Sequence, residues 1–253
     1  MNSDYKQRPG LDTTFYDKES SFYSIKRYEG VADTYTKFFF KKRQQVLLSF
    51  IKSICIKDNE KLSLIDIGCA DGVVTQEIDN TFPESFEKII GIDVAPKMIE
   101  EAQKKNLKPN ISFFVRGEED VALKYDVALE VGFLNPTLFD QEFPFIKNIL
   151  KENGYFICSV AAKQSIHSIL KMRDKEYVKT YFNYNEYEKV FNDHFEVIRS
   201  EPYGLFIPKL WAFPNVANVI QPFLESILKF LTPGLFQEKL YLLKKRREVS
   251  FKE

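Results

Sequence analysis

A short glycine-rich stretch, residues 64–72 (LIDIGCADG), carries the strongest chemical signal in the sequence. An apolar run leads into Asp66, and the small residues Gly68, Ala70 and Gly72 follow at intervals of two. Small residues let a backbone turn sharply and let a ligand lie against it. The helix expected directly afterwards would point its free N–H groups and its positive dipole end at that ligand. The stretch therefore predicts a binding loop for a small molecule at the end of a strand.

A second acidic residue, Asp93, stands at the end of another apolar run, within residues 88–94 (KIIGIDV). A carboxylate in this position can accept hydrogen bonds from both hydroxyl groups of a ribose. Asp93 follows Asp66 by 27 residues, a separation that fits one strand–helix–strand unit. Taken alone, Asp93 would be an ordinary turn residue at a strand end. Its pairing with the glycine-rich loop is what makes it a ligand candidate.

Segments typical of strands alternate with segments typical of helices around these two sites. Five short strands separated by helices favour parallel pairing, because parallel neighbours need a crossover connection. Several strands are apolar throughout, as expected when both faces of a sheet are covered. The sequence therefore predicts a doubly wound α/β sheet. The expected strands are 62–67, 88–94, 111–116, 125–131 and 155–160, and the expected helices begin near residues 34, 72, 96 and 135.

Two classes of ligand use such a loop. A dinucleotide site of the GxGxxG type would need Gly or Ala at position 73, where Val73 stands, and this weighs against NAD. Residues 66–72 instead resemble the first motif of the class I S-adenosylmethionine-dependent methyltransferases, D/E-x-G-x-G-x-G, with Ala70 in the middle position. Residues 91–98 (GIDVAPKM) resemble the GxDxSxxM segment of the same family.

The resemblance covers about residues 34–200 and points to the small-molecule type of methyltransferase. It implies a Rossmann-like sheet of seven strands in a single domain, residues 34–253. A helical cap segment, residues 1–33, would precede this domain, and an apolar insert, residues 203–238, would precede the last strand.

The resemblance also implies a binding site for S-adenosylmethionine and its product S-adenosylhomocysteine. The loop would line the amino-acid part of the cofactor, with Asp66 holding the loop and the ammonium group, while Asp93 would bind the ribose. Either Glu118 or Glu119 would accept a hydrogen bond from the adenine amino group, and their positions in the motif do not distinguish between them. The residues implied to bind the cofactor are Asp66, Gly68, Cys69, Ala70, Gly72, Asp93, Val94, Met98, Glu118, Glu119, Glu130 and Tyr28.

One histidine is a candidate catalytic residue. His167 follows the fifth expected strand, on the side of the sheet where the resemblance places the acceptor. A neutral imidazole there can take a proton from an attacking hydroxyl or amine. The competing interpretation is a surface histidine on a helix. Little acid–base machinery is required, because in-line displacement at a sulfonium depends mainly on alignment of the nucleophile and exclusion of water.

Composition excludes several other classes of protein. The 253 residues contain 36 Lys and Arg against 36 Asp and Glu, so there is no basic excess for a nucleic-acid partner. Three scattered cysteines, Cys55, Cys69 and Cys158, predict reduced thiols, and two histidines without a cysteine cluster predict no metal site. No signal peptide and no uncharged stretch of about 18 apolar residues is evident, which predicts a cytoplasmic protein.

The apolar insert does not determine which acceptor is methylated or which partners the protein has. Residues 203–236 are rich in aromatic and aliphatic residues, and Pro222 is expected to kink or split their helix. This composition fits four roles: packing into the core, a lid, contact with a membrane surface, and a homodimer interface. The predicted function is methyl transfer to a hydroxyl oxygen of an apolar, lipid-linked or sugar metabolite. The alternatives are N-methylation of an amino sugar, an NAD-dependent oxidoreductase, and a non-catalytic cofactor-binding or assembly protein.

Overall fold

The computed structural model describes residues 13–29, 34–56, 60–106, 108–118, 123–132, 134–173 and 175–246. The chain divides into two compact units, residues 1–123 and 124–253. The seven strands have the order β3-β2-β1-β4-β5-β7-β6 in one sheet. This order, with its antiparallel last strand, confirms the predicted Rossmann-like α/β fold. The sequence-based division at residue 34 stays a prediction.

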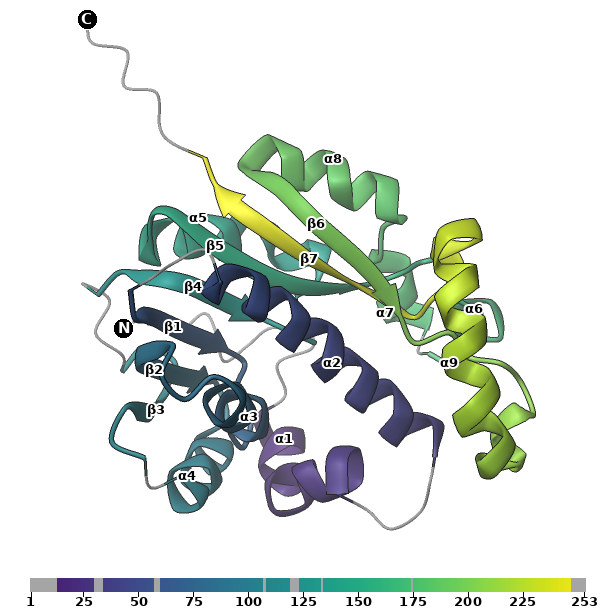
Figure 1. Cartoon of the computed structure of the whole chain (residues 1–253), viewed down its shortest axis with the longest axis horizontal. Coiled ribbons are helices and arrows are strands. Elements are labelled where there is room, and N and C mark those ends of the chain that lie inside the picture. The colour runs from purple at the N-terminus through teal and green to yellow at the C-terminus, as the bar shows by residue number, and fades with distance from the viewer. Residues whose placement is uncertain are drawn as a thin grey trace, which may run out of the picture. The chain divides into compact units, whose positions relative to one another are not determined.

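The first unit consists of three parallel strands with helices between them. β1 pairs with β2 and β2 pairs with β3, both in parallel. In Figure 1, α4 runs beside the strands, with α1 packed against it, in agreement with the contacts of α4 to β2, β3 and α1. The elements are α1 (Thr13–Glu19), η2 (Ser20–Phe22), η3 (Ile25–Glu29), α2 (Tyr35–Cys55), β1 (Leu62–Ile67), α3 (Val73–Thr81), β2 (Phe86–Asp93), α4 (Pro96–Lys105) and β3 (Ile111–Val115).

The second unit contains the antiparallel part of the sheet. β4 and β5 are parallel, whereas β7 runs antiparallel to both β5 and β6. Two short helices, α6 and α7, follow β5, and His167 lies in α6. The elements are β4 (Tyr125–Glu130), η4 (Pro136–Leu138), α5 (Phe139–Ile149), β5 (Leu150–Ala161), α6 (Ile166–Ile169), α7 (Lys175–Thr180), α8 (Tyr184–His194), β6 (Phe195–Tyr203), η5 (Leu210–Ala212), α9 (Pro214–Leu231), η6 (Pro233–Leu235) and β7 (Glu238–Lys245).

Aromatic side chains fill the interior of the second unit. Phe139 stacks on Phe143 at 4.6 Å between ring centroids, and Phe143 meets Phe195 edge-on at 5.5 Å. Phe191 extends the cluster to Tyr241 of β7, with ring centroids 4.9 Å apart. Such offset and edge-to-face pairs add about 0.5–1.5 kcal/mol each beyond their buried area. Much of the high aromatic content therefore serves to fix α5 and α8 on the sheet.

The insert does not pack its apolar face into the core, contrary to one of the sequence-based interpretations. In α9 the buried residues are Ala217, Gln221 and Glu225, and the large apolar side chains of the helix are mostly exposed. Pro222 lies within α9, which runs unbroken from Pro214 to Leu231, so the split expected at this residue is not found. Among the described residues, no helix combines the length and the apolar character required to cross a membrane.

Candidate cofactor site

The glycine-rich loop between β1 and α3 is held in an unusual backbone conformation. Gly68, Ala70 and Gly72 have φ angles of 77°, 49° and 75°, all in the left-handed region. The N–H groups of Gly68 and Cys69 both donate to the carbonyl oxygen of Ile92, at 2.8 and 3.1 Å. The loop is therefore fastened to the end of β2, and the alternation of small residues seen in the sequence is what permits its path.

Gly72 is required for steric reasons as well. It is the N-cap of α3, and a Cβ atom added to it would lie 2.6 Å from Cζ of Phe113 and 3.2 Å from Cβ of Ala102. No side chain caps α3 at this end, so Gly72 brings the loop backbone and the N-terminus of the helix together without an intervening group. Such a helix end is suited to binding an anionic group such as a carboxylate.

Asp93 connects the loop to the end of β2. Its Oδ2 accepts a hydrogen bond from the N–H of Ala70 and its Oδ1 accepts one from the N–H of Ala95, both at 2.9 Å. Burial raises the pKa of Asp93, and the backbone N–H groups oppose that shift. Two carboxylate oxygens offer about four acceptor positions. Asp93 can therefore hold the loop and still accept hydrogen bonds from the hydroxyl groups of a ribose. Binding of a ribose by Asp93 stays a prediction.

Asp66 is a buried carboxylate at the end of β1. The hydroxyl of Thr75 donates to its Oδ2 at 2.6 Å. Burial raises the pKa of Asp66 to about 6, the Thr75 hydrogen bond opposes that rise, and the neighbouring charge of Asp93 adds to it. A carboxylate placed beside a second carboxylate in a buried loop has a strong preference for a cation nearby. This environment fits the ammonium group that the resemblance assigns to Asp66.

We expect Asp66→Asn to stabilise the ligand-free protein at pH 7. Between the unfolded pKa of 3.8 and the folded value of about 6, the native state binds more protons, so wild-type stability falls as pH rises through that window. Removing the charge should raise the free energy of unfolding by about 3 kcal/mol at pH 7 and by little at pH 4. Chemical denaturation of the wild type and of Asp66→Asn at the two pH values measures this difference in the free energy of unfolding. Equal effects of the substitution at both pH values would contradict the assignment.

The N-terminal helical segment packs on the same loop. Tyr16 and Tyr23 lie against an apolar cluster formed by Ala70, Ala95 and Met98. Met98, one of the residues implied to bind the cofactor, is thus buried beneath tyrosines from residues 13–29. Burial raises the pKa of Tyr23 to about 12, so its hydroxyl stays protonated at neutral pH.

A buried carboxylate links this segment to the loop. The Ser24 hydroxyl donates to Oδ2 of Asp71, and Nζ of Lys105 pairs with the same oxygen at 2.6 Å. Tyr28, predicted as a cofactor contact, accepts a hydrogen bond from Nη2 of Arg43 at 3.1 Å, and its contact with the cofactor stays a prediction. The roles of Ser24 and Asp71 were missed from the sequence, although Asp71 lies inside the motif itself.

Four predicted cofactor residues of the first unit remain: Cys69, Val94, Glu118 and Glu119. Cys69 is buried in the loop, and burial raises the pKa of its thiol well above the usual range, so it is a poor nucleophile, while its contact with the cofactor stays a prediction. Val94 is half-buried beside Asp93. Glu118 is exposed in the turn after β3, where its N–H donates to the carbonyl oxygen of Val115 at 2.9 Å. Glu119 lies outside the described residues.

The second unit contains two of the predicted site residues, one at the end of β4 and one after β5. Glu130 is fully buried at the carboxyl end of β4. His167 belongs to α6, after β5, and its ring centroid lies 4.7 Å from that of Phe206. Burial and the charge of Arg173 lower the pKa of His167 to about 4. The imidazole is therefore neutral at physiological pH, but it is a weaker base than an ordinary histidine.

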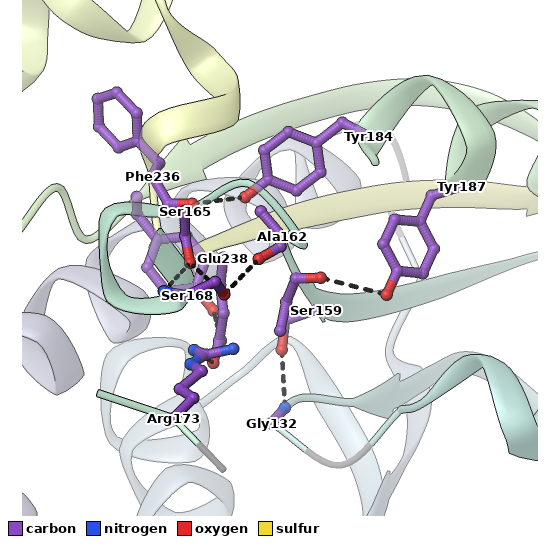
Figure 2. Close-up of polar contacts among 12 residues, drawn as sticks. Gly132, Ser159, Ala162, Ser165, Ser168, Arg173, Tyr184, Tyr187, Phe236 and Glu238 are labelled. Atoms are coloured by element: carbon purple, nitrogen blue, oxygen red, sulfur yellow. Dashed lines mark hydrogen bonds and ion pairs between the residues drawn. The ribbon is translucent and has the colours of Figure 1, made fainter. Parts of the chain in front are cut away.

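A polar network surrounds the carboxyl end of β5 (Figure 2). Ser159 accepts a hydrogen bond from the N–H of Gly132 at 2.7 Å, which ties the loop after β4 to β5. Nη2 of Arg173 lies 3.7 Å from Oε1 of Glu238 at the start of β7, and both side chains are largely buried. The hydroxyl of Tyr203 donates to the other oxygen of Glu238. Arg173 was missed from the sequence because nothing in its neighbourhood marks a buried guanidinium.

Comparisons with known proteins agree with this geometry. A family model described as a methyltransferase domain matches residues 39–203. Malonyl-[acyl-carrier protein] O-methyltransferase 2 of Ilyobacter polytropus is 26% identical over 166 residues, which cover 58% of this chain and 60% of that protein. A malonyl-[acyl-carrier protein] O-methyltransferase of Bacillus cereus is 31% identical over 108 residues, covering 41% of this chain and 39% of the relative. The chain thus spans less than two thirds of either relative's length.

A solved structure shows the same fold. Magnesium protoporphyrin IX methyltransferase from Synechocystis PCC 6803, with S-adenosylhomocysteine bound, superposes with a TM-score of 0.60 at 16% identity. The match covers 93% of this chain and all of that one.

Proposed function

We propose, because this chain belongs to the class I S-adenosylmethionine-dependent methyltransferases, that it transfers a methyl group from S-adenosylmethionine to an oxygen atom of a small acceptor. One observation carries the proposal. The left-handed loop of small residues is fastened by Asp93 through the N–H of Ala70, and the buried Asp66 lies at its start. This is a combination suited to a cationic amino acid joined to a ribose.

The residues of the loop would bind the cofactor by its charged and polar ends. Asp66 would hold the ammonium group, the backbone at Gly72 and the helix end would face the carboxylate, and Asp93 would accept the ribose hydroxyls. Tyr16 and Tyr23 would exclude water from the nucleoside. When bound, S-adenosylmethionine supplies an electrophilic methyl group on a sulfonium. The protein's own part is then to orient the acceptor and to keep the site dry.

A carboxylate acceptor fits the second unit better than an alcohol does. An alcohol must lose its proton as it attacks, and His167, with a pKa of about 4, is a weak acceptor for that proton. A carboxylate is already ionised and needs no base. The guanidinium of Arg173, whose pairing with Glu238 is long at 3.7 Å, can orient a carboxylate with its several N–H donors. The relatives named for malonyl-[acyl-carrier protein] also act on a group that ends in a carboxylate.

We therefore expect His167→Ala to reduce kcat less than about tenfold, whereas removal of a true general base reduces it by roughly 10²–10⁴. The pH profile of kcat should show no inflection near 6.5, the usual value for histidine, because the imidazole titrates near 4. Initial rates between pH 5 and pH 8 measure both effects. A hundredfold loss of kcat, with an inflection that disappears in the variant, would instead assign His167 as the base and favour an alcohol acceptor.

Two measurements test the proposal in sequence. Calorimetric titration with S-adenosylhomocysteine should show binding at one site, and no detectable binding would overturn the methyltransferase assignment. Methyl transfer from labelled S-adenosylmethionine is then compared between acyl thioesters that end in a carboxylate and matched thioesters that end in a hydroxyl. Label appearing only on the hydroxyl-terminated acceptors would refute the carboxylate proposal and leave the cofactor assignment intact.

A further inference from the structure

Helix α9 presents its apolar side to solvent. Eight large apolar side chains on this helix and the residue before it are 41 to 78% exposed, and we refer to them as the α9 face. They are Phe213, Val216, Val219, Ile220, Phe223, Ile227, Phe230 and Leu231. Their spacing of three and four residues places those of the helix along one side. Single exposed apolar residues are common on proteins, but a continuous row of this size marks an interaction surface.

The orientation of α9 is fixed by hydrogen bonds on its opposite side. Oε1 of Glu225 accepts a bond from the N–H of Leu205 at 2.8 Å, and Nε2 of Gln221 donates both to the carbonyl oxygen of Leu205 and, at 3.0 Å, to Oε1 of Glu225. Nε1 of Trp211 donates to Oε1 of Gln221 at 3.3 Å. Rotating the helix to bury the α9 face would break these buried bonds. The polar side is therefore anchored to the protein and the apolar side is held outward.

The surroundings of α9 are basic in a chain that is neutral overall. The segments that meet at Phe206 are residues 161–183, whose His167 packs on that ring, and residues 204–237. Together they contain seven basic and three acidic residues. Two of the cations, Lys229 and Arg173, pair with Glu201 and Glu238 directly outside these segments, and with these two carboxylates included the net charge is +2. Glu225 is the single acidic residue of α9, and it is buried. Five lysines of these segments are exposed: Lys163, Lys171, Lys175, Lys179 and Lys209.

We propose that the α9 face docks this protein on the surface of an anionic lipid bilayer. An amphipathic helix that lies in a membrane interface combines an apolar side with nearby cations, and anionic lipids attract each such lysine by about 1 kcal/mol. Three further exposed apolar residues lie beside the lysines of the α6 segment, namely Ile169, Leu170 and Met172. The helix would lie in the plane of the membrane, with its anchored polar side toward the protein.

A second copy of the chain is the main competing occupant. The α9 face presents an area on the order of 900 Å², close to the ~800 Å² that one partner contributes to a standard interface. Charge decides against this occupant, since two copies meeting here would bring the exposed lysines of one copy against those of the other, in a region of net charge +2. A lipid surface supplies both the apolar layer and the opposite charge. The inference does not depend on the proposed reaction.

The test is flotation of the full chain with vesicles of phosphatidylcholine containing about one third phosphatidylglycerol, compared with phosphatidylcholine alone. We expect the protein to float with the anionic vesicles and to bind them at least about tenfold more weakly in Phe223→Ser/Phe230→Ser. Ile56→Ser is the matched control, because Ile56 is 71% exposed at the end of α2, away from the α9 face in the sequence. It should bind vesicles like the wild type.

Three results would overturn the proposal. These are absence of flotation with any vesicle, equal flotation of the double variant and the wild type, and equal binding to neutral and anionic vesicles. Light scattering identifies the competitor: a wild-type dimer that the double variant loses, without vesicle binding, would assign the α9 face to self-association. Thermal denaturation shows whether each variant is folded, whatever ligand the protein binds. Titration with S-adenosylhomocysteine needs no vesicles, so failure of docking and failure of the proposed function are distinguishable.

Discussion

Gly72→Ala should abolish cofactor binding and lower the free energy of unfolding by about 3–4 kcal/mol. Two effects combine at this position. The residue has a left-handed φ of 75°, and its new Cβ would lie 2.6 Å from the ring of Phe113. Because the loop backbone and the start of α3 meet at Gly72, any shift that relieves the clash displaces the groups proposed to face the cofactor. Chemical denaturation and titration with S-adenosylhomocysteine measure the two effects.

Two other glycines separate the contributions. Gly117 also has a left-handed φ, 96°, but a Cβ there meets nothing within 4 Å, so Gly117→Ala isolates the backbone effect of about 1–2 kcal/mol. Gly91 has no such φ, but its Cβ would lie 2.5 Å from Cδ1 of Phe113 and 2.9 Å from Sγ of Cys69. Gly91→Ala therefore isolates the clash. If Gly72→Ala proved no worse than Gly117→Ala, the steric part of this account would be wrong.

Asp93→Ala should weaken binding of S-adenosylhomocysteine by at least about a hundredfold, roughly 3 kcal/mol. The substitution removes the acceptor proposed for the ribose hydroxyls, and it also leaves the N–H groups of Ala70 and Ala95 without the carboxylate that fixes them. Loop geometry and ligand contact are lost together. Calorimetric titration gives the affinity, and thermal denaturation shows whether the fold survives.

Asp93→Asn and Asp126→Ala serve as the comparison variants. Asn keeps one carbonyl oxygen as an acceptor, so its loss of affinity should fall between those of the wild type and Asp93→Ala. Asp126 carries a half-exposed ion pair with Lys151 at 2.8 Å, of a kind that contributes 0–1 kcal/mol, and its removal should leave affinity unchanged. Unaltered affinity in Asp93→Ala would refute the assignment of the nucleoside site.

The fold and the centre of the site could be predicted because local sequence determines them. The apolar strands 62–67 and 125–131 stand between turns and helices in a spacing that only a parallel sheet accommodates, and β1 and β4 were placed within one residue. The alternation of small residues from Gly68 to Gly72 likewise reports a backbone path, which the φ angles confirm. Both are properties of residues adjacent in the chain.

Contacts between distant residues could not be predicted in this way. The bond from Ser24 to Asp71 joins residues 47 positions apart, and no periodicity relates them. The sequence left the orientation of α9 open for a different reason. Apolar residues at helical spacing normally indicate the buried side, whereas here Gln221 and Glu225 bind the backbone of Leu205 and turn that side outward. Hydrogen bonds to a loop outweigh hydrophobic patterning in this helix.

The contact of Ser24 with Asp71 and of Tyr16 and Tyr23 with Met98 has a practical consequence for preparing the protein. A truncated version that starts at Tyr35 would retain all of the sheet but would lose the residues that cover its glycine-rich loop. Such a shortened form should purify well and yet bind S-adenosylhomocysteine poorly, if the loop has the proposed role. Affinity tags belong at the other terminus, where they leave this covering undisturbed.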